Sequence, residues 1–116
     1  MKEEIKMIEE TIRRIERMLQ AETNLDQIKK KEIMDLFQSL EFEIKKIPQE
    51  NVDIARSITK FTEASTYEAT RKTKNDNLLN LSIEGLKNAV TEYELTHPEL
   101  VSKVNAFILA LSGMGI

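Results

Sequence analysis

Apolar residues near the start of the chain recur with the period of a helix that packs along one stripe. Their positions are separated by steps of three, four, three and four, the heptad spacing of a coiled-coil seam. A later run repeats with steps of four, three, four and three. The two seams consist of Ile5, Ile8, Ile12, Ile15 and Leu19, and of Ile33, Phe37, Leu40, Ile44 and Ile47. We predict an antiparallel, coiled-coil-like helical hairpin over residues 1–47.

Few residues in the chain interrupt a helix. Only three glycines and two prolines occur among 116 residues, and no stretch alternates as a strand does. Pro48 ends the second helix, because the residue before a proline resists the α region. Pro98 fits the first turn of a later helix, where its missing N–H would be unpaired anyway. Further apolar stripes predict three more helices, over about 52–71, 78–95 and 98–112.

The fold class that follows is all-α: a helical bundle, or an extended helical assembly, of about five helices. The length suits one domain, since single cores usually hold about 100–150 residues, and no flexible linker divides the chain. Residues 1–50 carry ten basic and twelve acidic side chains, against seven and eight in residues 51–116. We expect a single domain over 1–116, with a charged hairpin over 1–47 and more buried helices over 52–116.

Local signals predict details of the later helices. The third stripe, Ile54, Ile58, Phe61, Ser65 and Ala69, is the weakest, because its second half is small. Asn51 is a good N-cap for that helix, and Thr96 with Glu99 has the spacing of a capping box. Gly85 lies inside the fourth helix, where a neighbouring backbone is expected to pass close. Gly113 suits the left-handed position after a helix end.

Composition excludes several classes of function. The net charge is −3, whereas nucleic-acid binders usually carry a basic excess. The absence of cysteine excludes disulfides and thiolate chemistry and fits a reducing compartment. No run approaches the ~18 apolar residues of a membrane span, and no signal peptide is visible at the N-terminus. We expect a cytoplasmic protein that binds neither nucleic acid nor membranes.

The single histidine offers the one candidate metal ligand with a recognisable spacing. Glu94 and His97 match the E-x-x-H spacing of di-iron bundles, but such a site needs two of these motifs and two further carboxylates. The alternative is a turn in which His97 caps a backbone group or packs. Glu92 and Glu99 crowd the same turn and could do acid–base work if burial separated their pKa values; solvated acids are commoner. We predict no catalytic residue, no metal site and no cofactor.

Two basic clusters could contact phosphate or an acidic partner. They are Lys29-Lys30-Lys31 and Arg71-Lys72-Lys74. The acidic total favours solvated helix ends instead. The glycine pair Gly113 and Gly115 opens no helix, so it forms no phosphate cradle.

The first seam and the chain's apolar tail are the strongest interaction signals. The surface predicted from them consists of Ile5, Ile8, Ile12, Ile15, Met114 and Ile116. The seam alternatively packs within the chain's own hairpin, and the tail alternatively tucks over the end of the bundle. We predict a homo-oligomer, with a dimer favoured, or binding of another protein.

The C-terminal third resembles a known family. The residues that carry this are Leu86, Val90, Tyr93-Glu94, His97-Pro98-Glu99-Leu100, Val104-Asn105 and the ending Leu111-Ser112-Gly113-Met114-Gly115-Ile116. They resemble an uncharacterised group of small bacterial helical proteins, catalogued as a domain of unknown function, with an HPxL…LxxMGI C-terminal segment. The resemblance covers about 35 residues well. It implies a small, helical, bacterial protein and supplies no activity, ligand or catalytic residue.

Three functions are compatible with these features. The leading one is a non-catalytic protein–protein interaction or self-assembling scaffold module. The alternative is a small regulatory ligand-binding bundle with its pocket near Tyr67, Gly85 and Phe107. A metal-dependent enzyme built on Glu94 and His97 is the third.

Overall fold

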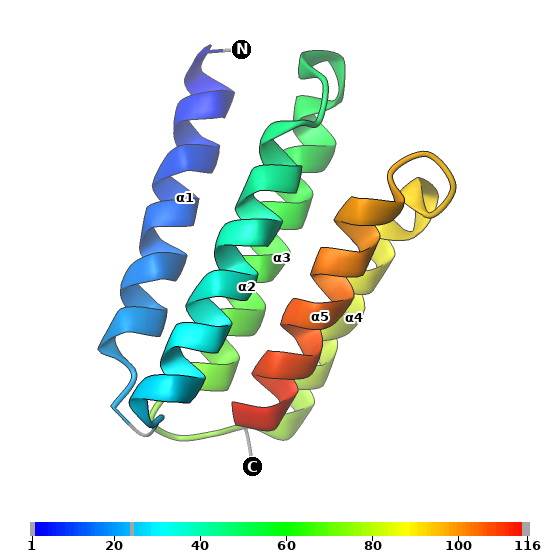
Figure 1. Cartoon of the computed structure of the whole chain (residues 1–116). Helices are drawn as coiled ribbons and strands as arrows, with labels where there is room; N and C mark the ends of the chain where they lie inside the picture. The colour runs from blue at the N-terminus through cyan, green and yellow to red at the C-terminus, as the bar shows by residue number, and fades with distance from the viewer. Residues whose placement is uncertain (1, 24, 115–116) are drawn as a thin grey trace.

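The protein folds as a bundle of helices (Figure 1). The structure is a computed structural model and describes residues 2–23 and 25–114. That part of the chain contains five α-helices, two 3-10 turns and no strand, which confirms the all-α prediction. Its radius of gyration is 13.5 Å, against about 13 Å expected for a compact chain of this length, so the helices form a bundle and not an extended assembly. The elements are α1 (Lys2–Ala21), α2 (Gln27–Lys45), η1 (Gln49–Asn51), α3 (Val52–Thr70), α4 (Asp76–Val90), η2 (Thr91–Tyr93) and α5 (Pro98–Met114).

α1 and α2 each have their largest interface with a helix that does not follow or precede them in the sequence. α1 and α2 are consecutive and antiparallel, as predicted, and α3 runs beside α1 in the same direction (Figure 1). The largest interface of α1 is nevertheless with α3, and the largest interface of α2 is with α5. α3 and α4 pack as an antiparallel pair. The two predicted seams therefore each face a helix from the second half of the chain.

The core consists largely of the residues of the predicted stripes. Phe37 and Phe107 are fully buried at its centre, with ring centroids 5.6 Å apart. The aliphatic side chains around them come from all five helices. They include Ile12, Ile15, Leu19, Ile33, Leu40, Ile44, Ile58, Leu79, Ile83, Leu86, Val90, Leu100, Val104, Ile108 and Leu111.

The predicted stripe of α3 was wrong at Phe61. That side chain is 40% exposed, whereas Thr59, Thr62 and Thr66 are buried. Burying a hydroxyl is costly unless it forms a hydrogen bond. Each threonine donates to a carbonyl one turn earlier, as Thr62 does to Ile58 at 2.7 Å and Thr66 to Thr62 at 2.8 Å. The threonines therefore act as small, self-satisfied core residues, and α1 and α4 pack closely on α3.

Both glycine predictions need correction. An ideal Cβ at Gly85 would lie 2.2 Å from the ring of Phe61, so a side chain, not a backbone, occupies the space there. Gly113 lies within α5, which continues to Met114, and no glycine in the described residues has a positive φ. Gly113 is therefore not a left-handed helix end. An added Cβ at Gly113 would meet nothing within 4 Å.

Side-chain N-caps form at the starts of α2 and α4, whereas the two caps predicted from the sequence, at Asn51 and Thr96, do not form. Asp26 accepts from the N–H of Lys29 at 2.8 Å, and Asn75 accepts from the N–H of Leu78 at 3.1 Å, so both are side-chain N-caps. Asn51 makes no such bond, because the turn η1 leads straight into α3. α5 begins at Pro98 as predicted, but the Thr96 hydroxyl lies 3.0 Å from Nδ1 of His97 instead of capping the helix.

Candidate functional site

The predicted interaction surface divides into buried and accessible residues. Ile8, Ile12 and Ile15 are buried in the core of the single chain, so the intrachain alternative accounts for them. Ile5 and Met114 are half-buried. Ile116, like Gly115, lies outside the described residues.

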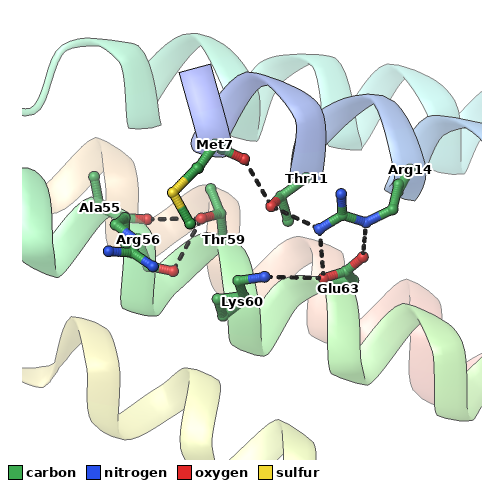
Figure 2. Close-up of polar contacts among 8 residues, drawn as sticks. All are labelled: Met7, Thr11, Arg14, Ala55, Arg56, Thr59, Lys60 and Glu63. Carbon is green, nitrogen blue, oxygen red and sulfur yellow. Dashed lines mark hydrogen bonds and ion pairs between the residues drawn. The ribbon is translucent and has the colours of Figure 1, made fainter. Parts of the chain in front are cut away.

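The seam between α1 and α3 holds the densest group of polar contacts (Figure 2). Nε of Arg14 donates to Glu63 at 2.6 Å and its second nitrogen donates to the same carboxylate at 3.3 Å. Arg14 also donates to the Thr11 hydroxyl at 3.0 Å, which in turn donates to the carbonyl of Met7 at 2.9 Å. The hydrogen bond that Arg14 donates to the Glu63 carboxylate raises the pKa of Arg14 above its ordinary value. The contacts between Arg14 and Glu63 hold α1 on α3.

We expect Arg14 and Glu63 to be coupled in stability. Exposed ion pairs usually contribute about 0.2–1 kcal/mol to the free energy of unfolding. Because Arg14 makes two hydrogen bonds to Glu63, we expect this pair to lie near the upper end of that range. A double-mutant cycle with Arg14→Ala and Glu63→Ala in urea unfolding measures the coupling. The more exposed pair Lys31 and Asp35, at 3.0 Å along one helix, is the matched control. Equal or weaker coupling for Arg14 and Glu63 would show that the seam is not held in this way.

Glu94 and His97 do not share a helical face. α4 ends at Val90 and the chain continues through η2, so both residues lie in the turn before α5. The His97 ring stands edge-on to the Tyr93 ring, with 4.8 Å between centroids. The backbone N–H of His97 donates to the carbonyl of Tyr93 at 2.8 Å. Glu94 is exposed, as are Glu92 and Glu99. Within residues 2–23 and 25–114, no three His, Asp or Glu side chains gather as metal ligands would.

Tyr93 is expected to make the stability of the fold depend on alkaline pH. Its ring is buried and burial raises its pKa, helped by the negative charges of Asp53 and Glu92. The folded chain therefore keeps a phenol proton that the unfolded chain releases near pH 10, so the free energy of unfolding falls as pH rises through that value. Tyr93→Phe should remove the contribution of Tyr93 and make this decline smaller.

The same variant should keep or gain stability at pH 7. The Tyr93 hydroxyl has no hydrogen-bond partner among the described residues, and replacing such a group by an apolar isostere is neutral or stabilising by up to about 1 kcal/mol. Urea unfolding at pH 7 and pH 10.5 tests both effects. Tyr67→Phe, at an exposed tyrosine, is the control that should leave the alkaline decline unchanged. A decline as large in Tyr93→Phe as in the wild-type chain would contradict the prediction.

The basic clusters bind the C-terminal ends of helices. Nζ of Lys30 donates to the carbonyl of Gln20, the penultimate residue of α1, at 2.9 Å. Nζ of Lys74 donates to the carbonyl of Ala69 in α3 and, at 3.3 Å, to that of Met114 in α5. Arg71 pairs with Glu68 at 2.8 Å. Cations stabilise the negative end of a helix dipole, so these residues have a structural role without any external anion.

The pocket predicted near Tyr67, Gly85 and Phe107 does not form between those residues. Phe107 is fully buried against Phe37, and the ring of Phe61 covers Gly85. Tyr67 is exposed, in a shallow groove between the ends of α1 and α3. The ligand-binding alternative therefore cannot use this arrangement.

An apolar groove lies between α2 and α5. Its volume is about 200 Å³. Two small residues, Ala110 and Gly113, form one wall, and Lys29 and Glu32 place charges of both signs on the rim. The groove is lined by Leu25, Lys29, Glu32, Ile33, Leu36, Leu109, Ala110, Gly113 and Met114. It is open because no side chain fills the space beside Gly113.

The face of α5 that points away from the core is apolar where it borders this groove. No charged residue occurs from Val104 to Met114. Leu109 is 74% exposed on that face, and Ile28 of α2 is 73% exposed. The exposed side of this part of α5 is uncharged, although the polar residues Asn105 and Ser112 lie on it beside Leu109. In the single chain α5 is covered only on one side.

No protein-family model, curated protein or solved structure matches the chain. The resemblance of the C-terminal third to a bacterial family therefore stays a prediction. In the described part of the chain, no helix is both long and apolar enough to cross a membrane.

The sequence prediction found one residue of the groove, Met114, and missed its other lining residues. The signal that could have found them is the uncharged run from Val104 to Met114, in a chain with 32% charged residues. An uncharged run of this length in a helix at the surface indicates that the outer face of the helix is also covered, by another protein surface. Gly113 was assigned to a helix end, which hid its effect on the surface.

Proposed function

We propose that the protein is a non-catalytic protein–protein interaction module that binds its partner through the groove between α2 and α5. The observation that carries this is the uncharged outer face of α5, on which Leu109 stands exposed beside the open space at Gly113. Exposed apolar surface with a polar rim is characteristic of protein contacts. The lack of cysteine suits a reducing compartment, and we place the module in the cytoplasm.

The size of the groove favours side chains over a small molecule as its occupant. Pockets for drug-sized ligands usually have volumes of about 300–1,000 Å³, whereas an apolar space of about 150 Å³ holds a benzene-sized group. A groove of about 200 Å³ therefore fits one or two aliphatic side chains of a partner.

A second candidate, binding of a small apolar ligand, rests on a larger groove at the opposite end of the bundle. That groove has a volume of about 390 Å³ and an aliphatic lining that includes Ile5, Ile44 and Val52. Ligand sites also need polar groups that fix orientation. The charged residues here are Glu9 and Lys45, and Lys45 already pairs with Glu41 at 2.8 Å. This candidate is therefore the weaker one.

The test fills the groove without disturbing the fold. An added Cβ at Gly113 meets nothing within 4 Å, and the backbone there has no positive φ. Leucine is also favoured over glycine in a helix by roughly 0.5–1 kcal/mol. Native mass spectrometry compares this variant with the wild-type chain, both isolated from the host. We expect the wild-type chain to retain a polypeptide, of its own or another mass, that Gly113→Leu loses. Asn88→Leu, exposed on α4, is the control that should retain it.

A further inference from the structure

We infer that the partner in the groove between α2 and α5 is a second copy of this chain, docked about a two-fold axis so that α5 packs antiparallel on α5. This inference rests on the proposed function and names the occupant of the same groove. It is carried by the self-complementary shape and charge of the surface.

The shape of α5 provides a projection and a gap one helical turn apart. Leu109 projects from the outer face, and Gly113, four residues later on the same side of the helix, leaves an open space. A two-fold interface requires one patch to complement itself. When α5 meets a second α5 running in the opposite direction, Leu109 of each copy lies over Gly113 of the other.

Two charged residues of α2 are complementary to each other across the same two-fold axis. Lys29 and Glu32 lie on the rim of the groove, and within the described residues neither side chain forms an ion pair. In the inferred dimer the two-fold axis lies between the copies, perpendicular to the helices, and runs over α5 at the level between residues 109 and 113 and over α2 at the level between residues 29 and 32. Both pairs line the same groove. The axis therefore also sets Lys29 of each copy opposite Glu32 of the second copy.

The surrounding surface permits this approach. The outer face of α5 next to Leu109 carries Asn105, Ala106 and Ser112, which are small or uncharged. At these three positions two such faces bring neither like charges nor large side chains together. By contrast, the outer face of α1 carries charged residues such as Glu10, Arg13 and Arg17, which suits solvent.

Sedimentation equilibrium of the full chain tests the inference. We expect the wild-type chain, at concentrations from 1 to about 200 μM in order of magnitude, to approach twice the monomer mass of 13.4 kDa. Gly113→Leu should raise the dissociation constant at least tenfold, because the added side chain occupies the space that receives Leu109. Leu109→Ala should do the same and, since Leu109 is exposed in the monomer, cannot act by unfolding it. Asn88→Leu is the matched control and should not change the constant.

A charge exchange tests the register. Glu32→Lys alone should weaken the dimer, because it sets Lys29 opposite a second lysine. Lys29→Glu combined with Glu32→Lys should restore wild-type association, since the exchanged pair is again complementary. Failure of the double variant to recover would overturn this register.

The remaining outcomes separate the inference from the proposed function. A wild-type chain that stays monomeric overturns the dimer, as does a dimer that Gly113→Leu and Leu109→Ala leave intact. If the monomeric wild-type chain still carries another polypeptide from its host that Gly113→Leu loses, the groove binds proteins but not a second copy. If Gly113→Leu affects neither association nor any bound polypeptide, both the inference and the proposed function fail.

Discussion

The variant Ile12→Asp should leave the chain largely unfolded at pH 7. Ile12 is 3% exposed within the single chain, so the substitution removes a buried aliphatic side chain, worth about 2–5 kcal/mol when truncated. It also places a carboxylate in an apolar site, which costs several kcal/mol more as an order of magnitude. Because domains of this size are stable by only about 5–15 kcal/mol, these losses consume most or all of the stability.

The pH dependence of the stability of Ile12→Asp shows whether the buried carboxylate causes its destabilisation. Burial raises the pKa of the introduced carboxyl group, so the folded state binds a proton that the unfolded chain has released above about pH 4. Destabilisation should therefore be smallest near pH 4 and grow as pH rises. Circular dichroism and urea unfolding at pH 4 and pH 7 measure this.

Two control variants separate burial from helix formation. Ile12→Val should cost about 0.5–1.5 kcal/mol, and Arg13→Ala, at an exposed neighbour, should remain within about 0.5 kcal/mol of wild type. The first seam was also predicted as a possible surface between subunits. A folded Ile12→Asp chain that had lost only a bound partner would restore that prediction and contradict the packing described here.

Phe107→Ala should lower the free energy of unfolding by about 3–5 kcal/mol. Phe107 is fully buried, and its ring lies 5.6 Å from that of Phe37 at an angle of 45°. Truncation removes the burial of one ring and leaves a cavity beside the other, which a bundle of rigid helices fills only in part. Part of the loss, about 0.5–1.5 kcal/mol, comes from the contact between the rings.

Urea unfolding of Phe37→Leu, Phe107→Leu and the double variant isolates that contact. We expect the double variant to be more stable than the sum of the single effects predicts, because the second substitution has no ring contact left to lose. Phe42→Leu, at a half-exposed phenylalanine of α2, is the control and should change stability little. Additive effects at Phe37 and Phe107 would show that the two rings do not interact.

The sequence predicted the helices and most of the core because spacing alone decides which side chains share a face. It did not predict partners, since a seam such as that of α1 fits any helix with a matching stripe. α3 became the partner of α1 through residues that a hydrophobic pattern ranks low. Three threonines can be buried because each hydroxyl donates a hydrogen bond to a carbonyl of its own helix; they are Thr59, Thr62 and Thr66. These hydrogen bonds are seen in the structure and not in the sequence pattern.

The groove between α2 and α5 was harder to predict from the sequence than the helices were. Met114 was identified from its apolar character, but the open space depends on Gly113 remaining helical and on the distance between α2 and α5. A glycine near the end of a helix usually marks that end. Only the continuation of α5 to Met114 shows that this glycine shapes a surface.

The pairing of α1 with α3 also determines the order in which the chain can fold as it is synthesised. Arg14 and Glu63 are 49 residues apart, so α1 has no principal partner until most of α3 has left the ribosome. At synthesis rates of about 5–20 residues per second, this delay lasts on the order of 3–10 s. During that time the isoleucine seam of α1 is exposed. The seam of α2 stays exposed until α5, its main partner, has been synthesised. A nascent chain of this topology therefore exposes the aliphatic stripe of α1 before the helix that covers it has been made, and a chaperone that recognises aliphatic segments could bind this stripe first.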